Sequence, residues 1–299
     1  MHIDSAQLAA FAGVVREGSF DAAARALHVT PSAISQRIKL LEERLGQVLV
    51  VRASPCMPTQ AGARLYRHAQ QLQLLEHEAL QAFAPDASGT LGRSSAAIAV
   101  NADSLATWFM PAIGQVHSLL GTQFELVVED QDHSSNLLRQ GKVLAAVTAD
   151  PHAVQGCRIE PLGAMRYVAV ATPAYMQRYF PKGVTDEALA HAPVNVFNRK
   201  DELQTRFLKQ LTKKRVQPPV HYVPSTHGFI HAALAGIGWG MNPQMLVAPL
   251  LASGDLVEIA PGKSLDVLLY WQAWRLQSEL LQALAQAVRQ AARILSQTV

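Results

Sequence analysis

Cysteine is scarce in this sequence, with only Cys56 and Cys157 among 299 residues. The two lie far apart in the chain and match no metal-binding spacing. A zinc ribbon and a disulfide framework are therefore excluded. We interpret both residues as structural thiols, with a redox switch at Cys56 as the less favoured alternative.

Long hydrophobic runs are also missing. No stretch approaches the roughly 20 apolar residues that a membrane span requires. The N-terminus has no basic run followed by an apolar core and a cleavage site, which a secretory signal would need. We therefore expect a cytoplasmic protein with no membrane partner.

The motifs of common enzymes are absent too. No Gly-x-Ser-x-Gly elbow supports a hydrolase. His227 and His231 stand four apart, which could place two imidazoles on one metal, but no Glu follows His227 and no third ligand is evident. The glycine-rich segment 236–240 precedes a strand and not a helix, so it predicts a turn instead of a phosphate loop. The sequence thus predicts no enzyme, no metal and no cofactor.

Charged residues make up only 16% of the chain, with a net charge of +3, whereas 49% of the residues are hydrophobic. A chain of this length and composition can bury two or more cores. The charge is uneven, because eight Lys and Arg stand against four Asp and Glu between Arg16 and Arg67. A basic N-terminal module indicates a nucleic-acid partner for that module alone.

The segment Ser19 to Arg44 predicts two short helices joined by a tight turn. Apolar residues recur at helical spacing between Phe20 and Leu27, and Ser19 before them has the chemistry of an N-cap. Pro31 suits the first turn of a second helix, because its missing N–H would have no partner there. Thr30 is the expected cap of that helix.

The second helix has two different faces. Ile34, Ile38, Leu41 and Leu45 form a predicted buried stripe. The opposite face carries hydroxyls, an amide and cations, which can approach base edges and phosphates in a major groove. For this pattern alone, a solvated face on an ordinary helical hairpin is an equally good interpretation. The predicted DNA contacts, with Arg52 placed on a phosphate at the wing, are Thr30, Pro31, Ser32, Ser35, Gln36, Arg37, Lys39 and Arg52.

A wing and a long helix are expected next. Val48 to Arg52 predicts a short strand, and two prolines between Ala53 and Pro58 predict the wing tip. Thr59 is the expected cap of a helix that runs to about Ala84. Apolar residues recur along this helix at alternating steps of four and three, a heptad seam that most simply packs against its own copy in a dimer. Packing of the seam on the chain's own first helix is the alternative.

Beyond a Gly/Ser-rich hinge at 86–94, apolar runs alternate with helical stretches. This alternation predicts a parallel α/β sheet with helices on both faces, in which ligands bind beyond the carboxyl ends of the strands. The runs are 96–100, 124–128, 143–147, 167–171, 194–197 and 268–271. The predicted effector contacts follow these runs or lie in a later loop, and they are Asn101, Asp103, Ser104, Glu129, Asp130, Asp132, Thr148, Asn198, Arg199, Ser225 and Thr226.

Acids are prominent at these strand ends, where Asp150 and Asp201 also lie, and His227 stands in the later loop. A small cationic ligand would need carboxylates at one end, while hydroxyls, helix N-terminal amides or Arg199 could bind a carboxylate at the other. Capping a helix is the more common role for any single loop acid. The group of acids is therefore stronger evidence for a ligand site than any one of them.

Together these features resemble a LysR-type transcriptional regulator over essentially the full length. The family wing commonly ends in Leu-Thr, one variable residue and Ala-Gly, whereas Pro58 replaces that Leu before Thr59-Gln-Ala-Gly62. This departure, with Val51-Arg52 and Pro55, resembles the ArgP/LysG subgroup, which senses lysine and arginine and controls export of basic amino acids. Segments 100–109 and 128–130 are similar to the subgroup's two sensor loops. In the second loop an acid commonly follows Asp directly, whereas Gln131 precedes Asp132 here.

The resemblance implies dimers that often pair into tetramers, promoter DNA as a partner, and lysine or arginine as the effector. Two alternatives stay open: a ligand-independent architectural or replication-control DNA-binding protein, and a LysR-type regulator for a different small effector. The expected organisation is a winged helix-turn-helix domain (1–58), a linker and dimerisation helix (59–85), a hinge (86–94) and a two-lobed α/β periplasmic-binding-protein-like effector domain (95–299), with lobe I at about 95–166 and 268–299 and lobe II at about 167–267.

Overall fold

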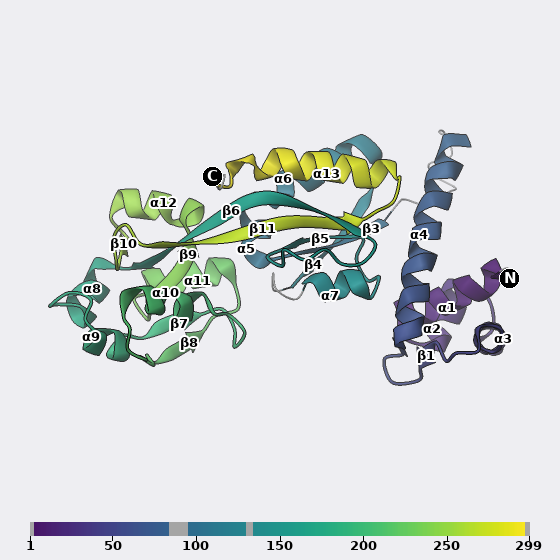
Figure 1. Ribbon diagram of the computed structural model, residues 1–299, viewed down its shortest axis with the longest axis horizontal. Coiled ribbons are helices and arrows are strands. Elements are labelled where there is room, and N and C mark those ends of the chain that lie inside the picture. The colour runs from purple at the N-terminus through teal and green to yellow at the C-terminus, as the bar shows by residue number, and fades with distance from the viewer. Residues whose placement is uncertain (1–2, 84–94, 130–133, 297–299) are drawn as a thin grey trace.

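The structure is a computed structural model that describes residues 3–83, 95–129 and 134–296. A small helical N-terminal domain is followed by one long helix, α4 (Gln60–Phe83), and by an elongated α/β domain of two lobes (Figure 1). The predicted hinge at 86–94 and the predicted effector contacts Asp130 and Asp132 lie outside the described residues. Within those ranges, no helix is both long and apolar enough to cross a membrane.

The N-terminal domain contains the two helices that the sequence predicts, after a first helix α1 (Ser5–Glu17). Helix α2 (Phe20–Ala26) begins at Ser19, whose Oγ accepts a hydrogen bond from the N–H of Ala22 at 3.1 Å. Helix α3 (Pro31–Leu45) begins at Thr30, whose Oγ1 accepts from the N–H of Ala33 at 3.2 Å. Both predicted caps are confirmed.

The buried stripe of α3 fixes which of its faces is free. Ile34, Ile38 and Leu41 are fully buried and belong to one core with Phe11 and Val14 of α1. Because side chains three and four positions apart share a face of a helix, this packing leaves the opposite face of α3 open to solvent.

The wing is shorter than predicted. Strand β1 contains only Val50–Val51 and pairs antiparallel with β2 (Met57–Pro58). Oε1 of Glu42 accepts hydrogen bonds from the N–H groups of Leu49, at 2.7 Å, and Val50, at 3.3 Å. These two bonds anchor the wing to α3, the second helix of the pair.

Helix α4 contacts both domains of the chain. Tyr66 and Ala69 are buried in the core of the N-terminal domain, and Leu65 and Leu72 pack against it. The intramolecular alternative for the seam therefore holds in part. Farther along, Leu74 packs on the core of the α/β domain.

Two side chains of α4 also make hydrogen bonds to lobe I. Nη1 of Arg67 donates a hydrogen bond to the carbonyl oxygen of Gln155 at 2.8 Å. Oε1 of Glu78 accepts from the hydroxyl of Ser278 at 2.6 Å and from the N–H of Leu280 at 3.2 Å. Leu80 and Phe83, at the end of α4, are 51% and 88% exposed. This end of the helix therefore presents apolar surface that the rest of the described chain does not cover.

The sheet of the α/β domain is mixed and not parallel throughout. Strand β3 (Ser95–Val100) runs parallel to β4 (Gln123–Val128) and β5 (Ala145–Thr148), as predicted. However, β11 (Ser264–Trp274) runs antiparallel to both β5 and β6 (Cys157–Ala171). The strand order is β10-β6-β11-β5-β3-β4, with β10 at Val257–Glu258, and β9 (Gly240–Pro243) pairs with β6. The predicted parallel sheet is therefore confirmed for β3, β4 and β5 and wrong for the runs 167–171 and 268–271.

Strands β6 and β11 run from one lobe into the other (Figure 1). They are longer than the predicted runs 167–171 and 268–271, because polar residues interrupt the apolar pattern on their exposed face. Arg166 and Asp266 lie opposite each other there, with Nη2 and Oδ2 2.8 Å apart. A period-2 pattern with charges outside is expected of a strand that is buried on one face only.

The other elements cover this sheet and build lobe II. Helices α6 and α13 pack together on one side of lobe I, and α7 lies on the other side (Figure 1). Strands β7 and β8 form a separate parallel pair in lobe II. The bounds are α5 (Ala102–Thr107), α6 (Phe109–Leu120), α7 (Ser134–Arg139), α8 (Pro173–Tyr179), α9 (Asp186–His191), β7 (Val194–Val196), α10 (Leu203–Leu211), β8 (Val220–Tyr222), α11 (Thr226–Leu234), β9 (Gly240–Pro243), α12 (Gln244–Ser253), β10 (Val257–Glu258) and α13 (Glu279–Ala291).

Candidate DNA-reading face and inter-lobe cleft

The exposed face of α3 carries the side chains that the sequence assigns to DNA. Ser32, Gln36 and Lys39 are exposed, and Ser35 and Arg37 are partly buried. Thr30 and Pro31 form the start of the helix, as its cap and its first residue. A face of short polar groups beside a cation suits contact with base edges and phosphates.

Arg52 lies at the base of the wing, where it is exposed. Its guanidinium carbon is 5.1 Å from the centre of the Phe20 ring, a cation–π contact that orients the side chain. The contact leaves the charge at the surface beside α2. This position is compatible with the predicted phosphate contact.

Replacing Lys39 by Ala is expected to weaken DNA binding and to reduce the salt dependence of the affinity by about one charge, because one phosphate contact is lost. The partner of Lys39 in the chain is Glu43, with Nζ and Oε1 3.7 Å apart and both side chains largely exposed, so this pair does not hold Lys39 away from DNA. The measurement is DNA affinity across a salt series. Lys182→Ala, an exposed lysine of lobe II, is the charge-matched control. An unchanged salt slope would place Lys39 on bases or in solvent.

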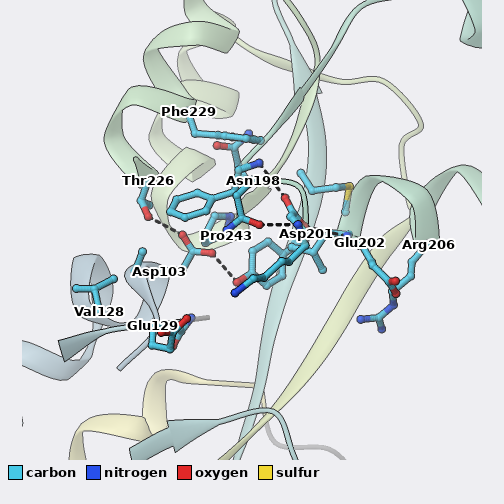
Figure 2. Close-up of a pocket in the computed structure, with 18 residues that line it drawn as sticks. Asp103, Val128, Glu129, Asn198, Asp201, Glu202, Arg206, Thr226, Phe229 and Pro243 are labelled. Atoms are coloured by element: carbon cyan, nitrogen blue, oxygen red, sulfur yellow. Dashed lines mark hydrogen bonds between the residues drawn. The ribbon is translucent and has the colours of Figure 1, made fainter. Parts of the chain in front are cut away.

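A cleft of about 350 Å³ lies between the two lobes (Figure 2). Lobe I supplies the start of α5 and the end of β4, and lobe II supplies the loop before α10 and part of α11. The polar and charged residues that line it are Asn101, Asp103, Glu129, Tyr167, Asn198, Lys200, Asp201, Glu202, Arg206, Thr226 and Asn242.

Asp103 joins three elements at the centre of this cleft. Its Oδ2 accepts a hydrogen bond from the hydroxyl of Tyr167 on β6 at 2.7 Å. Its Oδ1 accepts from the hydroxyl of Thr226 on α11 at 2.8 Å. Both bonds are drawn in Figure 2. Because α5 belongs to lobe I and α11 to lobe II, this carboxyl group bridges the lobes directly.

Burial raises the pKa of Asp103, and the nearby Asp201 adds to the rise, while the two hydroxyl donors oppose it. Burial and the Asp103 carboxylate together raise the pKa of Tyr167 well above its usual value, so its hydroxyl keeps its proton and acts as a donor. A carboxylate that is costly to ionise gains strongly from a cation placed beside it.

Two buried amide oxygens in the same cleft have no hydrogen-bond partner among the described residues. They are Oδ1 of Asn101, which is 6% exposed, and Oδ1 of Asn242, which is 1% exposed. A buried acceptor without a donor costs free energy, so such atoms are usually satisfied in native proteins.

Asp201 has a structural role at the edge of the cleft. Its Oδ2 accepts from the N–H of Phe197 at 3.0 Å, and its Oδ1 accepts from the N–H of Leu203 at 2.9 Å. These bonds hold the loop that presents Lys200 and the helix that carries Arg206. The cleft thus combines buried acceptors at its centre with two exposed cations from lobe II.

The structure brings five predicted effector contacts together and leaves four others outside the lining. Asn101, Asp103, Glu129, Asn198 and Thr226 line the cleft. The hydroxyl of Ser104 instead accepts from the indole N–H of Trp108, and those of Thr148 and Ser225 accept from the backbone N–H groups of Asp150 and Gly228. Arg199 is exposed, with its guanidinium carbon 5.1 Å from the centre of the Tyr222 ring.

Several cleft residues are not among the predicted contacts. Tyr167 lies within β6 and Asn242 within β9, which pair antiparallel, so they do not follow a strand end. Lys200, Glu202 and Arg206 lie in and after a loop whose charges have no periodic pattern. An isolated Asn within the otherwise apolar stretch around Met241 was the one signal that could have pointed to this position.

A winged helix-turn-helix, a linker helix and a two-lobed domain with a polar cleft define the class of ligand-responsive DNA-binding regulators. Residues 5–63 match the family described as bacterial regulatory helix-turn-helix protein, lysR family, and residues 91–293 match the LysR substrate binding domain. The chain therefore belongs to the LysR family of transcriptional regulators, which are not enzymes.

Similar proteins cover nearly the whole chain. The transcriptional regulator LysG of Mycobacterium tuberculosis H37Rv is 49% identical over 290 residues, which are 97% of this chain and 94% of that protein. The crystal structure of ArgP from Mycobacterium tuberculosis has a TM-score of 0.89 and 47% identity, with 100% of both chains covered. Full-length LysG from Corynebacterium glutamicum with bound effector Arg has a TM-score of 0.81 and 39% identity, with 99% of this chain and 100% of that chain covered.

Proposed function

We propose that this regulator senses lysine or arginine in its inter-lobe cleft and controls genes such as an exporter of basic amino acids. The buried Asp103 carboxyl group, which both lobes share, is the observation that carries this proposal. The proposal includes the eight DNA contacts and the domain bounds predicted from the sequence. A cytoplasmic location follows from the same proposal, because promoter DNA is the target.

The chemistry of the cleft matches a cationic amino acid. Its cationic group would pair with Asp103, in a cleft that the polar residues Asn101 and Asn242 also line. Lys200 and Arg206 are the cations placed to receive the ligand's carboxylate, in the role that the sequence predicts for Arg199. The Corynebacterium glutamicum relative, whose structure contains Arg as its effector, supports this class of ligand.

The response would travel from the cleft to the DNA-reading face through lobe geometry. The Thr226–Asp103 hydrogen bond ties α11 to α5, so a ligand that changes this bond changes the relation of the lobes. Lobe I is in turn tied to α4 through Arg67 and Glu78. A ligand shifts such an equilibrium only if it binds the two arrangements with different affinity.

A dimer completes the proposed reader. The exposed apolar end of α4, with Leu80 and Phe83, would be covered by a second copy of the same helix. Two copies of α3 would then lie on successive turns of a duplex, and pairing of dimers into tetramers is the expected higher state.

Calorimetry with matched ligands tests the effector. Lysine and arginine are expected to bind, whereas norleucine and citrulline, which lack the side-chain cation, should bind on the order of a hundredfold more weakly because Asp103 would stay buried without its partner. The proposal would be wrong if neither cationic amino acid bound, or if norleucine and citrulline bound equally well. DNA affinity, footprint and transcription that ignore both cations would favour the architectural alternative.

A further inference from the structure

A second cavity, which we call the inter-domain pocket, lies between α4 and lobe I. It has a volume of about 460 Å³ and is separate from the inter-lobe cleft. The wing strand β2, the first turns of α4, the end of α7 and the loop before β6 supply its walls. The lining residues are Met57, Pro58, Thr59, Gln60, Ala63, Arg64, Arg67, Arg139, Gln140, Val154 and Gln155.

The charged residues of this lining are all of one sign. Arg64, Arg67 and Arg139 line the pocket, and no carboxylate does. In the described part of the chain, none of the ion pairs includes any of the three. Three guanidinium groups around one cavity repel each other, and this repulsion is removed when an anion occupies it.

Two of the three arginines have neutral hydrogen-bond partners, which leaves their charge available. Nη1 of Arg67 donates to the carbonyl oxygen of Gln155 at 2.8 Å, and Nη1 of Arg139 donates to Oδ1 of Asn136 at 2.7 Å. These bonds orient the two planar guanidinium groups without neutralising their charge. The pocket also faces the N-terminal end of the 24-residue helix α4, where the helix dipole favours negative charge.

The two walls of the pocket are held at a fixed separation. Gly141, at a φ of +70°, lies against α4 so closely that a Cβ atom there would stand 2.8 Å from the Cα of Arg67. This close approach needs glycine both for the left-handed backbone and for the missing side chain. An anion in the pocket would therefore bind two domains that already touch, and it would stabilise the docking of α4 on lobe I.

We propose that the inter-domain pocket is a binding site for a phosphate group, in which Arg64 and Arg139 clamp the oxygens from the two domains. Guanidinium groups match phosphate geometry with paired, charge-assisted hydrogen bonds. The phosphate belongs either to a free phosphorylated small molecule or to the DNA backbone beside the wing. Both sources share this chemistry.

Titration of the DNA-free, full-length protein with pyrophosphate, at constant ionic strength, tests whether the pocket binds a free phosphorylated small molecule. Saturable binding is expected, and each of the substitutions Arg64→Gln and Arg139→Gln should weaken it about tenfold, as expected for the loss of a charge-assisted hydrogen bond. Both side chains are exposed, so the variants should fold. Arg293→Gln, an exposed arginine outside the pocket, removes the same charge and should leave binding unchanged.

The DNA affinity of Arg139→Gln across a salt series tests whether the phosphate belongs to the DNA backbone. Because Arg139 belongs to the effector domain, a salt slope lowered by about one would place a backbone phosphate in the pocket. Weaker pyrophosphate binding in the variants supports a free phosphorylated ligand, and a lowered salt slope supports a DNA phosphate. The proposal is overturned if the substitutions change neither pyrophosphate binding nor the salt slope. Arginine binding in the inter-lobe cleft should be unchanged in these variants, so failure here is distinct from failure of the proposed effector.

Discussion

Asp103→Asn is expected to lower the affinity for lysine and arginine on the order of a hundredfold or more, because the buried carboxylate is the charge that the ligand's cation would need. Asn keeps the shape of the side chain and can still bond to the hydroxyls of Tyr167 and Thr226, which hold Asp103 at 2.7 and 2.8 Å. The loss should therefore come from charge and not from a collapsed cleft. Calorimetry on the variant and the parent protein is the measurement.

The pH dependence of binding gives the same prediction a second readout. Burial raises the pKa of Asp103 above its usual 3.8, and only the ionised form attracts a cation. The affinity for arginine should thus rise with pH through a range above 3.8, and Asp103→Asn should remove this dependence. Equal affinities, or the same pH profile in both proteins, would contradict the role of Asp103.

The stability of the ligand-free variant shows whether a loss of ligand affinity comes from the missing charge or from misfolding. Because the pKa of Asp103 is raised in the folded state, its contribution to stability is present below the unfolded value and is lost as pH rises through the folded value. The ligand-free Asp103→Asn protein should accordingly be at least as stable as the parent at neutral pH. Any gain in stability of Asp103→Asn over the parent should shrink as the pH falls towards 3.8, the ordinary pKa of an Asp carboxyl group. Thermal melts at several pH values measure this.

The part of the cleft that follows parallel strands could be predicted from the sequence. Asn101 and Asp103 come directly after β3, and Glu129 comes directly after β4, which runs parallel to it. Because carboxyl ends of parallel strands meet at one edge of a sheet, the residues after them converge. The same reasoning put Thr148 at this edge, but its hydroxyl instead accepts from the backbone N–H of Asp150.

The contribution of the antiparallel strands could not be found in this way. Tyr167 and Asn242 lie within β6 and β9, where the pattern shows only that a side chain is buried or exposed. The bond of Tyr167 to Asp103 and the place of Asn242 in the same cleft depend on two crossings between lobes that no local signal encodes. The sequence also does not distinguish the roles of the neighbours Ser225 and Thr226. Ser225 caps α11, and only Thr226 lines the cleft.

Gly62 has a physical role that the motif Thr59-Gln-Ala-Gly62 does not reveal by itself. Thr59 Oγ1 accepts from the N–H of Gly62 at 3.0 Å and donates to the carbonyl oxygen of Val48 at 2.7 Å, so it ties the start of α4 to the wing. One turn into the helix, a Cβ atom on Gly62 would overlap the carbonyl oxygen of Leu49. The glycine therefore lets the wing lie directly on α4.

Gly62→Ala is expected to destabilise the N-terminal domain by about 3 kcal/mol, near the upper end of the usual cost of overpacking, and to abolish most DNA binding. The obstacle is backbone that cannot easily move, because the carbonyl of Leu49 already accepts from the N–H of Thr59 at 2.9 Å and its N–H donates to Glu42. Since Glu42 belongs to α3, a displaced wing would also disturb the DNA-reading helix. Urea unfolding and DNA affinity are the measurements.

Gly114→Ala is the matched control, because Gly114 is also a helical glycine but has nothing within 4 Å of an added Cβ atom. At this site alanine should be neutral or stabilising by up to about 1 kcal/mol, the difference in helix propensity. Effector binding should survive in both variants, because the inter-lobe cleft lies in the other domain. If Gly62→Ala behaved like Gly114→Ala, the wing would be free to move away from α4, and the tight contact between them would not be what positions the DNA-reading face.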